Sequence, residues 1–158
     1  LTAGGNYIFN NCTMVSIGNY YLQHKNALLT VSNVVSSSIT NNVTATFNNS
    51  IIYGESGLPD DEINLIKQGS TAYNVTFNNT LYKMKSSDPT TATFNGSKLK
   101  NIKPEFDSVN IGDRYLNFRL KTTSPAKDKG SIISGVTTDL DGKNRNVGLP
   151  DLGCFELQ

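Results

Sequence analysis

The chain has 158 residues, of which 37% are hydrophobic and 17% charged, and its formal net charge at pH 7 is +1. This length suits one domain with a continuous core. The nearly balanced charge gives no electrostatic basis for binding nucleic acid, and no apolar run is long enough to span a bilayer. We therefore expect a monomer with no nucleic-acid partner and no insertion into a membrane.

A seven-residue motif recurs five times along the chain. It consists of an apolar residue, any residue, Phe or Val, a polar residue, Asn or Gly, a small residue and a variable last position. The alternation predicts a half-buried strand, and the Asn or Gly predicts a bend in the left-handed region of backbone space. Each copy is thus expected to be a strand that turns sharply and continues. The copies are residues 7–13, 29–35, 45–51, 75–81 and 92–98.

The distance in sequence from the start of one copy to the start of the next is typical of repeat proteins, in which each unit buries its apolar face on the next unit. We predict an all-β fold, a right-handed single-stranded parallel β-helix (solenoid) with strands ~4.8 Å apart and a C-terminal capping segment. Hairpin dipeptides between the strands, typical of sandwiches and propellers, are missing from the sequence. The third positions should stack as an apolar column and the fifth as an amide ladder. The column is Phe9, Val31, Phe47, Phe77 and Phe94, and the ladder is Asn11, Asn33, Asn49 and Asn79.

The loop between the first two copies contains the only histidine of the chain, His24, with Tyr20, Tyr21 and Lys25 near it. One hypothesis is a sugar-binding lip, in which the tyrosine rings stack on sugars while His24 and Lys25 donate hydrogen bonds. The alternative is an ordinary surface loop, which we favour because a lone histidine has no evident partner.

The longest interval between copies contains four acids, Glu55, Asp60, Asp61 and Glu62, which we interpret as a solvated bulge rather than a metal site. Residues 59–68 could form a short helix that starts at a proline. Alternatively, residues 63–66 form another strand. We favour the strand because a short helix without a packing partner is marginally stable.

The C-terminal segment, residues 102–158, which we call the tail, differs in composition from the repeats. Its motifs are KPEFD at 103–107, LNFRL at 116–120, SPAKDKG at 124–130, TDLDGKNR at 138–145 and DLGCFE at 151–156. In order and spacing they resemble the C-terminal end of bacterial right-handed parallel β-helix proteins of the pectate-lyase-like class, in particular those with a choice-of-anchor Q domain. The resemblance implies an exported or cell-surface bacterial protein, exposed at the outer membrane or in the periplasm.

We divide the chain into β-helix coils over residues 1–101 and the final coil or coils with a C-terminal cap over residues 102–158. Leu152 and Phe155 should insert into the apolar interior over the last coil, because an open end of a β-helix exposes unpaired strand edges. The chain also starts close to a strand without a polar cap, so we expect further coils before Leu1 in the full protein.

Asp139 and Asp141 open a stretch similar to a calcium loop, but cationic residues follow where further oxygen ligands are needed. We favour a turn in which an aspartate accepts hydrogen bonds from backbone amides, with Arg145 paired to an acid such as Asp128 or Asp151. We expect no cofactor, with Ca²⁺ as the alternative.

The two cysteines, Cys12 and Cys154, are expected in the first and last coils. Several strand spacings would then separate them, which is too far for a disulfide.

No acid–base or metal constellation lines the repeats. The leading hypothesis is therefore a non-catalytic surface protein that binds a polysaccharide or another cell-surface partner. One alternative is the C-terminal part of a polysaccharide lyase or glycoside hydrolase whose catalytic coils lie upstream, and a second is a structural spacer.

Overall fold

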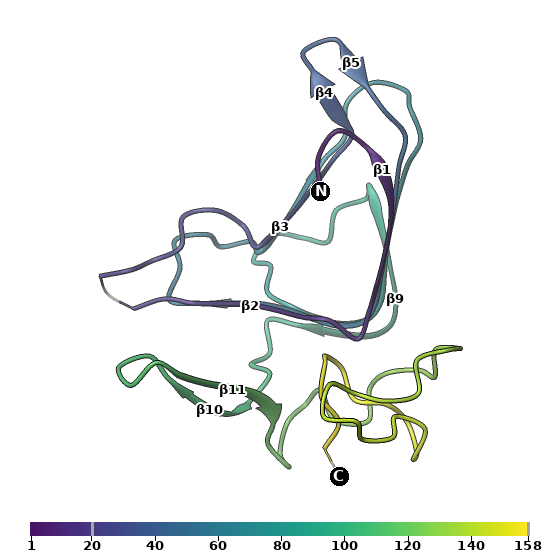
Figure 1. Ribbon diagram of the computed structural model, residues 1–158. Helices are drawn as coiled ribbons and strands as arrows, with labels where there is room; N and C mark the ends of the chain where they lie inside the picture. Colours follow the sequence, from purple (N-terminus) through teal and green to yellow (C-terminus); the bar gives the residue numbers. More distant parts are fainter. Residues whose placement is uncertain (20, 158) are drawn as a thin grey trace.

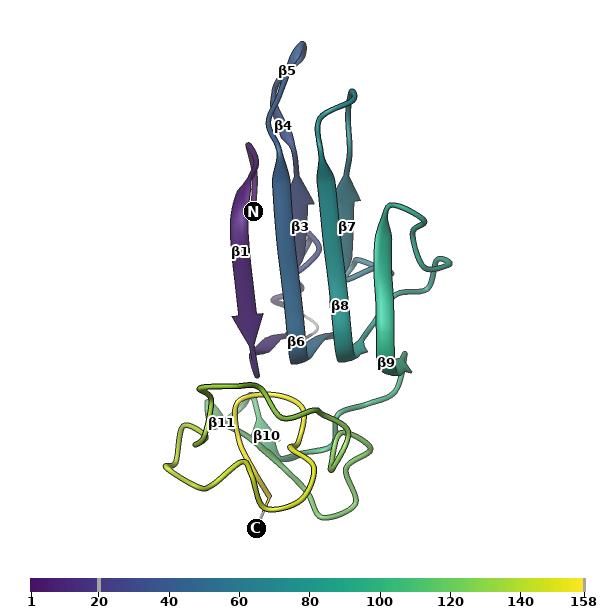
Figure 2. The ribbon, with the colours of Figure 1, turned by 90° about the vertical axis from the view of Figure 1, so that its right-hand side faces the viewer.

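The computed structural model describes residues 1–19 and 21–157, and this part of the chain is all-β, with no helix. It therefore contains no helix long and apolar enough to cross a membrane. The main sheet is parallel, with the order β1-β6-β8-β9, and β2 pairs with the second half of β6 (Figures 1 and 2). Its strands are β1 (Gly5–Asn10), β2 (Thr13–Ile17), β6 (Val43–Glu55), β8 (Tyr73–Tyr82) and β9 (Ala92–Lys100).

Three strand pairs accompany this sheet. β3 (Leu29–Ser32) pairs with β7 (Ile63–Ile66) in parallel, which confirms the strand predicted in the longest interval. Two antiparallel hairpins complete the fold, where the sequence argument had expected none. They are β4 (Val34–Ser36) with β5 (Ile39–Thr40), and β10 (Phe106–Asn110) with β11 (Tyr115–Leu120).

The repeated motif bends where the sequence predicts. The φ angles are 51° at Asn11, 48° at Asn49, 51° at Asn79 and 66° at Gly96, all in the left-handed region that Asn and Gly tolerate. The bend divides each of these four copies into two straight parts. We call β1 and the parts of β6, β8 and β9 before the bend the first arms, and β2 and the parts after it the second arms.

The predicted phenylalanine column is present inside the bend. The rings of Phe9, Phe47, Phe77 and Phe94 stack with centroid separations of 4.9, 4.9 and 4.7 Å. Phe47 and Phe77, in the middle, are buried, and the two end rings are half-buried. The parallel register pairs identical residues, so each ring lies directly over the next.

The second copy of the motif does not join this column, which corrects the assignment of Val31 and Asn33. Val31 is buried but lies in β3, opposite Leu65 of β7, on another side of the same core. Asn33 is buried in a loop, where its Nδ2 donates to Gln68 O at 2.8 Å and its Oδ1 accepts from Gln68 N at 2.9 Å. The chain then enters the β4–β5 hairpin instead of a second arm.

The amide ladder is present, but one position earlier in the motif than predicted. Each Nδ2 donates to the Oδ1 of the neighbouring strand, at 3.0, 2.8 and 2.8 Å in turn along Asn95, Asn78, Asn48 and Asn10. The fifth-position asparagines do not form a regular ladder: Asn79 Nδ2 donates to Asn49 Oδ1 at a long distance of 3.4 Å. The fourth position points outward from a straight strand and can stack, whereas the fifth lies at the bend.

The tail does not cover the last copy, which corrects the predicted cap. It lies along the outer side of the second arms (Figures 1 and 2) and contacts several copies. Gly153 N donates to Asn49 O at 2.8 Å, and Cys154 N donates to Thr13 Oγ1 at 3.0 Å. Phe155 is half-buried, with the Arg119 guanidinium 4.4 Å above its ring, and so does not insert into the interior.

Two apolar clusters therefore flank the second arms. The inner core lies inside the bend and contains the phenylalanine column together with residues of β3 and β7. The outer core lies between the second arms and the tail. Leu152 is fully buried there and not in the inner core, and its buried neighbours are Ile51, Tyr53, Leu81, Phe106, Leu120 and Ala126.

Candidate functional site

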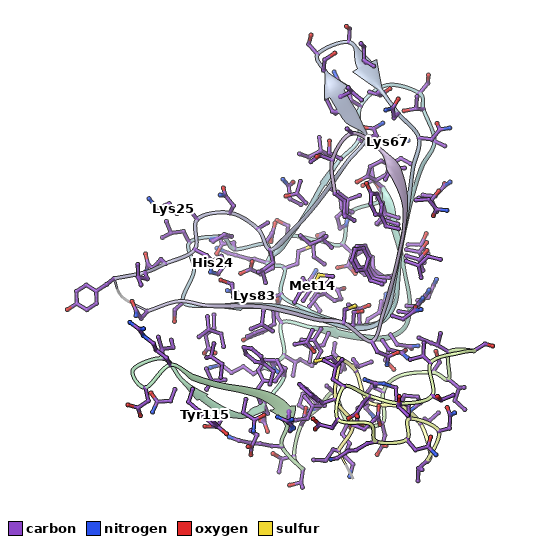
Figure 3. All side chains as sticks on the ribbon, in the orientation of Figure 1. Met14, His24, Lys25, Lys67, Lys83 and Tyr115 are labelled. Carbon is purple, nitrogen blue, oxygen red and sulfur yellow. The ribbon has the colours of Figure 1, made fainter. Side chains whose placement is uncertain are left out.

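The residues proposed as a sugar-binding lip do not converge. Tyr20 lies outside the described residues. Tyr21 is 87% exposed, and Lys25, also exposed, lies on the outer side of its loop, whereas His24 turns toward the inside of the molecule (Figure 3). Among the described residues, the structure therefore does not bring His24 together with Tyr21 and Lys25.

His24 instead joins a buried ionic cluster. Its Nε2 lies 2.8 Å from Glu62 Oε1, and the Glu62 side chain is fully buried. Lys83 Nζ lies 4.0 Å from the same oxygen and donates to Gly54 O at 3.1 Å, while Leu28 N donates to Glu62 Oε2 at 3.2 Å. The cluster links the loop before β3, the loop before β7 and the end of β8, so Glu62 is not part of a solvated bulge.

Two glycines make room for this cluster. A Cβ at Gly54 would lie 1.8 Å from Glu62 Oε1, and a Cβ at Gly57 would lie 1.9 Å from His24 Cε1. His24 Nδ1 is buried without a hydrogen-bond partner. Because the cluster joins three segments around the fully buried Glu62 carboxylate, we interpret it as a structural clamp between loops.

A hollow of about 450 Å³ lies between the end of β6 and the β10–β11 region. Tyr53 and Glu55 reach it from β6, and the segment that enters β10 supplies most of the remaining wall. The polar and aromatic lining residues are Tyr53, Glu55, Lys103, Glu105, Phe106, Asp107, Lys121 and Thr123.

Charged side chains of both signs line this hollow, and several are hydrogen-bonded. Lys103 Nζ lies 2.5 Å from Glu55 Oε1, and this hydrogen bond raises the pKa of Lys103. Burial, with a smaller contribution from the Glu55 charge, raises the pKa of Tyr53. Both partners of the ion pair are largely exposed, so its contribution to stability is small.

The other two acids of the hollow also accept hydrogen bonds. Glu105 Oε2 accepts from Thr123 Oγ1 at 2.7 Å, and Asp107 Oδ2 accepts from Asn117 Nδ2 at 2.7 Å. The hollow thus presents carboxylates in fixed orientations beside ammonium groups. The described residues contain no cluster of three or more His, Cys, Asp or Glu side chains that could hold a metal ion.

Asp139 and Asp141 form the predicted aspartate turn. Asp139 Oδ1 accepts from Asp141 N and Lys143 N, each at 2.8 Å, and its Oδ2 accepts from Glu156 N at 2.7 Å. Asp141 binds Arg119 through both carboxylate oxygens, at 2.7 and 2.6 Å. These donors occupy the oxygens that a cation would need.

Arg145 pairs with an acid, as predicted, but with neither of the two acids named as examples. Its Nη1 donates to Glu156 Oε1 at 2.5 Å, and both side chains are buried. In sequence, Asp151 is nearer to Arg145 than Glu156 is and Asp128 is farther away, so spacing could not identify the partner.

The cysteines are both free thiols but are not several strands apart. Cys12 and Cys154 both line a second hollow, separate from the one beside Tyr53, because the end of the tail returns to the first copy of the motif. The predicted separation was wrong because it assumed that the tail covers the last copy.

No family model matches the sequence, no curated protein matches it significantly, and no solved structure is significantly similar to it. No relative therefore assigns a role to the hollow. The sequence argument missed this site, although the segment 103–107, which alternates charge with Pro and Phe, was a signal that could have located it.

Proposed function

We propose that the chain is part of an exported or cell-surface bacterial protein with a right-handed parallel β-helix of the pectate-lyase-like class, and that it binds a polysaccharide without cleaving it. The β-helix is supported by the parallel register of identical residues and by the recurring left-handed bends. The order of the tail motifs supports the class.

The hollow beside Tyr53 carries the binding proposal. Its volume of about 450 Å³ falls within the usual range for ligand pockets and would hold one or two sugar rings. Tyr53 and Phe106 provide apolar edges, and the charged groups provide donors and acceptors for hydroxyls. Sugars need this combination of apolar contact and polar orientation.

The charge of the lining narrows the ligand. Three carboxylates, from Glu55, Glu105 and Asp107, face two ammonium groups, from Lys103 and Lys121, which leaves a net charge of −1 (+2 − 3). A polyuronate would be repelled by this excess of acid. We infer a neutral polysaccharide or one that carries amino groups. The acids are held by Lys103, Thr123 and Asn117, which favours binding over proton transfer to a glycosidic bond.

Affinity-gel electrophoresis tests the proposal. Migration of the purified chain should be retarded by a neutral or amino-sugar polysaccharide and not by polygalacturonate. The double variant E105Q/D107N should lose most of the retardation, whereas the control K129A, at an exposed tail residue outside the hollow, should retain it.

Two outcomes would contradict the proposal. One is equal retardation of the folded double variant and the wild type. The other is the release of reducing or unsaturated ends from any of the polysaccharides, which would favour the alternative of a lyase or hydrolase.

A further inference from the structure

The outward side of the first arms carries a regular surface that the proposed binding hollow does not use. Its side chains alternate with the buried residues of the inner core and form three rows across β1, β6, β8 and β9. We call it the threonine–asparagine face. The first row is Asn6, Thr44 and Asn74, the second is Ile8, Thr46, Thr76 and Thr93, and the third is Asn10, Asn48, Asn78 and Asn95.

This face is flat as well as regular. In Figure 1 the four first arms nearly eclipse one another, and in Figure 2 they run side by side. The stacked phenylalanine rings beneath them are tilted by only 4°, 11° and 14° from one copy to the next. The near superposition of the arms in Figure 1 shows that the rows are nearly straight, and the ring separations of 4.7–4.9 Å give their repeat.

The composition of the face is unusual for this chain. All eleven positions are occupied by Asn, Thr or Ile, so the face contains no charged and no aromatic side chain. Ile8 is 68% exposed, and Asn6, Thr44, Asn74, Thr93 and Asn95 are also exposed. The missing charge disfavours an ionic partner, and the missing aromatic rings disfavour a sugar-stacking site.

The polar groups of the face are held in fixed positions. The amide ladder fixes the third row, because each amide is bonded to the one before it. In the second row, branching at Cβ restricts the rotamers of the threonines. The hydroxyl and methyl groups are therefore preorganised, and a rigid ligand could bind with little loss of side-chain entropy.

We propose that the threonine–asparagine face binds ice. A rigid, uncharged and periodic array of hydroxyls, amides and methyl groups is complementary to a periodic surface of water. Positions two residues apart along a strand are ~6.6 Å apart, so the face is a rectangular lattice of ~4.8 by ~6.6 Å. The shorter repeat, across the strands, is close to a spacing between rows of water oxygens on a prism face of hexagonal ice. Methyl groups beside each hydroxyl would order water in the grooves between the rows.

Partition of the purified chain into a slowly growing ice hemisphere tests this proposal, with inhibition of ice recrystallisation as a second readout. The wild type should enter the ice and keep its crystals small. The variant T46Y/T76Y places two rings in the centre of the face and should abolish both effects. The control T122Y carries the same substitution at an exposed tail residue and should behave as the wild type. Thermal melts show which variants are folded, and T93K, on the edge strand, replaces the double variant if that fails to fold.

Exclusion of the wild type from ice would overturn the proposal, and so would equal partition of folded T46Y/T76Y and wild type. Pull-down of the wild type by insoluble cellulose or chitin, lost in T46Y/T76Y, would assign the face to a crystalline polysaccharide instead. The variant E105Q/D107N separates this proposal from the polysaccharide hollow, because it should enter ice as the wild type does.

Discussion

At the scale of single residues, the asparagines at the bends have two tasks. Asn49 holds a φ of 48° with its backbone, and its fully buried side chain binds Ser131 of the tail in both directions. Its Nδ2 donates to Ser131 O at 2.7 Å, and its Oδ1 accepts from Ser131 N at 3.0 Å. Gly would satisfy the bend equally well but could not hold the tail. This explains why Asn and not Gly occupies the middle of the stack.

The buried acids of the tail share few positive charges. Glu156 accepts from Arg145 Nη1 and from Asp151 N, and its own N–H donates to Asp139 Oδ2. Burial, and after it the charge of Asp151, raise the pKa of Glu156 to about 7. Burial also raises the pKa of Asp151. The Arg145 guanidinium thus does not compensate the carboxylates of Asp139, Asp151 and Glu156. The folded state therefore favours the protonated form of Glu156.

This raised pKa predicts a pH dependence of stability. A carboxyl group that binds its proton more tightly when folded stabilises fully below its unfolded pKa, and this contribution is lost as the pH rises through the folded value. The free energy of unfolding should therefore fall by ~1–3 kcal/mol between about pH 4.5 and pH 7. Urea titrations at several pH values measure it. The variant E156Q should lose most of this slope, and identical slopes for the two chains would contradict the assignment.

The sequence patterns predicted the side chains of the repeated motif, but not the contacts between residues that lie outside the motif and far apart in the sequence. The buried phenylalanines and the left-handed asparagines follow from alternation and backbone sterics, which are local properties. His24 and Glu62 are 38 residues apart and meet only because two loops fold over β7 and β8. No spacing rule could have paired them, although Gly54 and Gly57 hinted at a close approach.

At the scale of elements, the first arms are stabilised by repetition. Each parallel strand places its phenylalanine on that of its neighbour, and the amide ladder repeats the same register on the outer side. The prediction failed for residues 29–35, which match the motif but form β3 and a hairpin. The motif specifies a strand and a possible turn, whereas the sheet that the strand joins is set by tertiary packing.

The phenylalanine column makes a graded prediction. Phe77 is 1% exposed and lies between two rings, so Phe77→Ala should reduce the free energy of unfolding by ~3–5 kcal/mol. Phe94 is half-buried at the end of the column, and Phe94→Ala should cost clearly less because water already reaches its site. Chemical denaturation measures both. A neutral Phe77→Ala, or equal losses for the two variants, would show that the column is not a cooperative core.

At the scale of the whole molecule, the tail acts as a strap across the stack and not as a lid on its end. Its hydrogen bonds reach Thr13 in the first copy, Asn49 in the third and Asn79 in the fourth. The outer core beneath it gives the second arms apolar neighbours on both sides. The sequence predicted that Leu152 is buried, but its composition could not show whether the tail runs along the second arms or covers the end of the stack.

The position of the tail across the second arms predicts that it stabilises the folded chain. Leu152 is fully buried in the outer core that also contains Ile51 and Leu81, so Leu152→Ala should reduce the free energy of unfolding by ~2–5 kcal/mol. Leu140, in the same tail, is 75% exposed, and Leu140→Ala should change it by no more than ~0.5 kcal/mol. Removal of residues 124–158 should have a larger effect, because it uncovers the outer apolar side of the second arms and promotes association. Thermal melts and light scattering after gel filtration measure these effects. A truncated chain that stays monomeric with an unchanged melting temperature would show that the second arms need no cover, and that the tail is held by the stack without stabilising it.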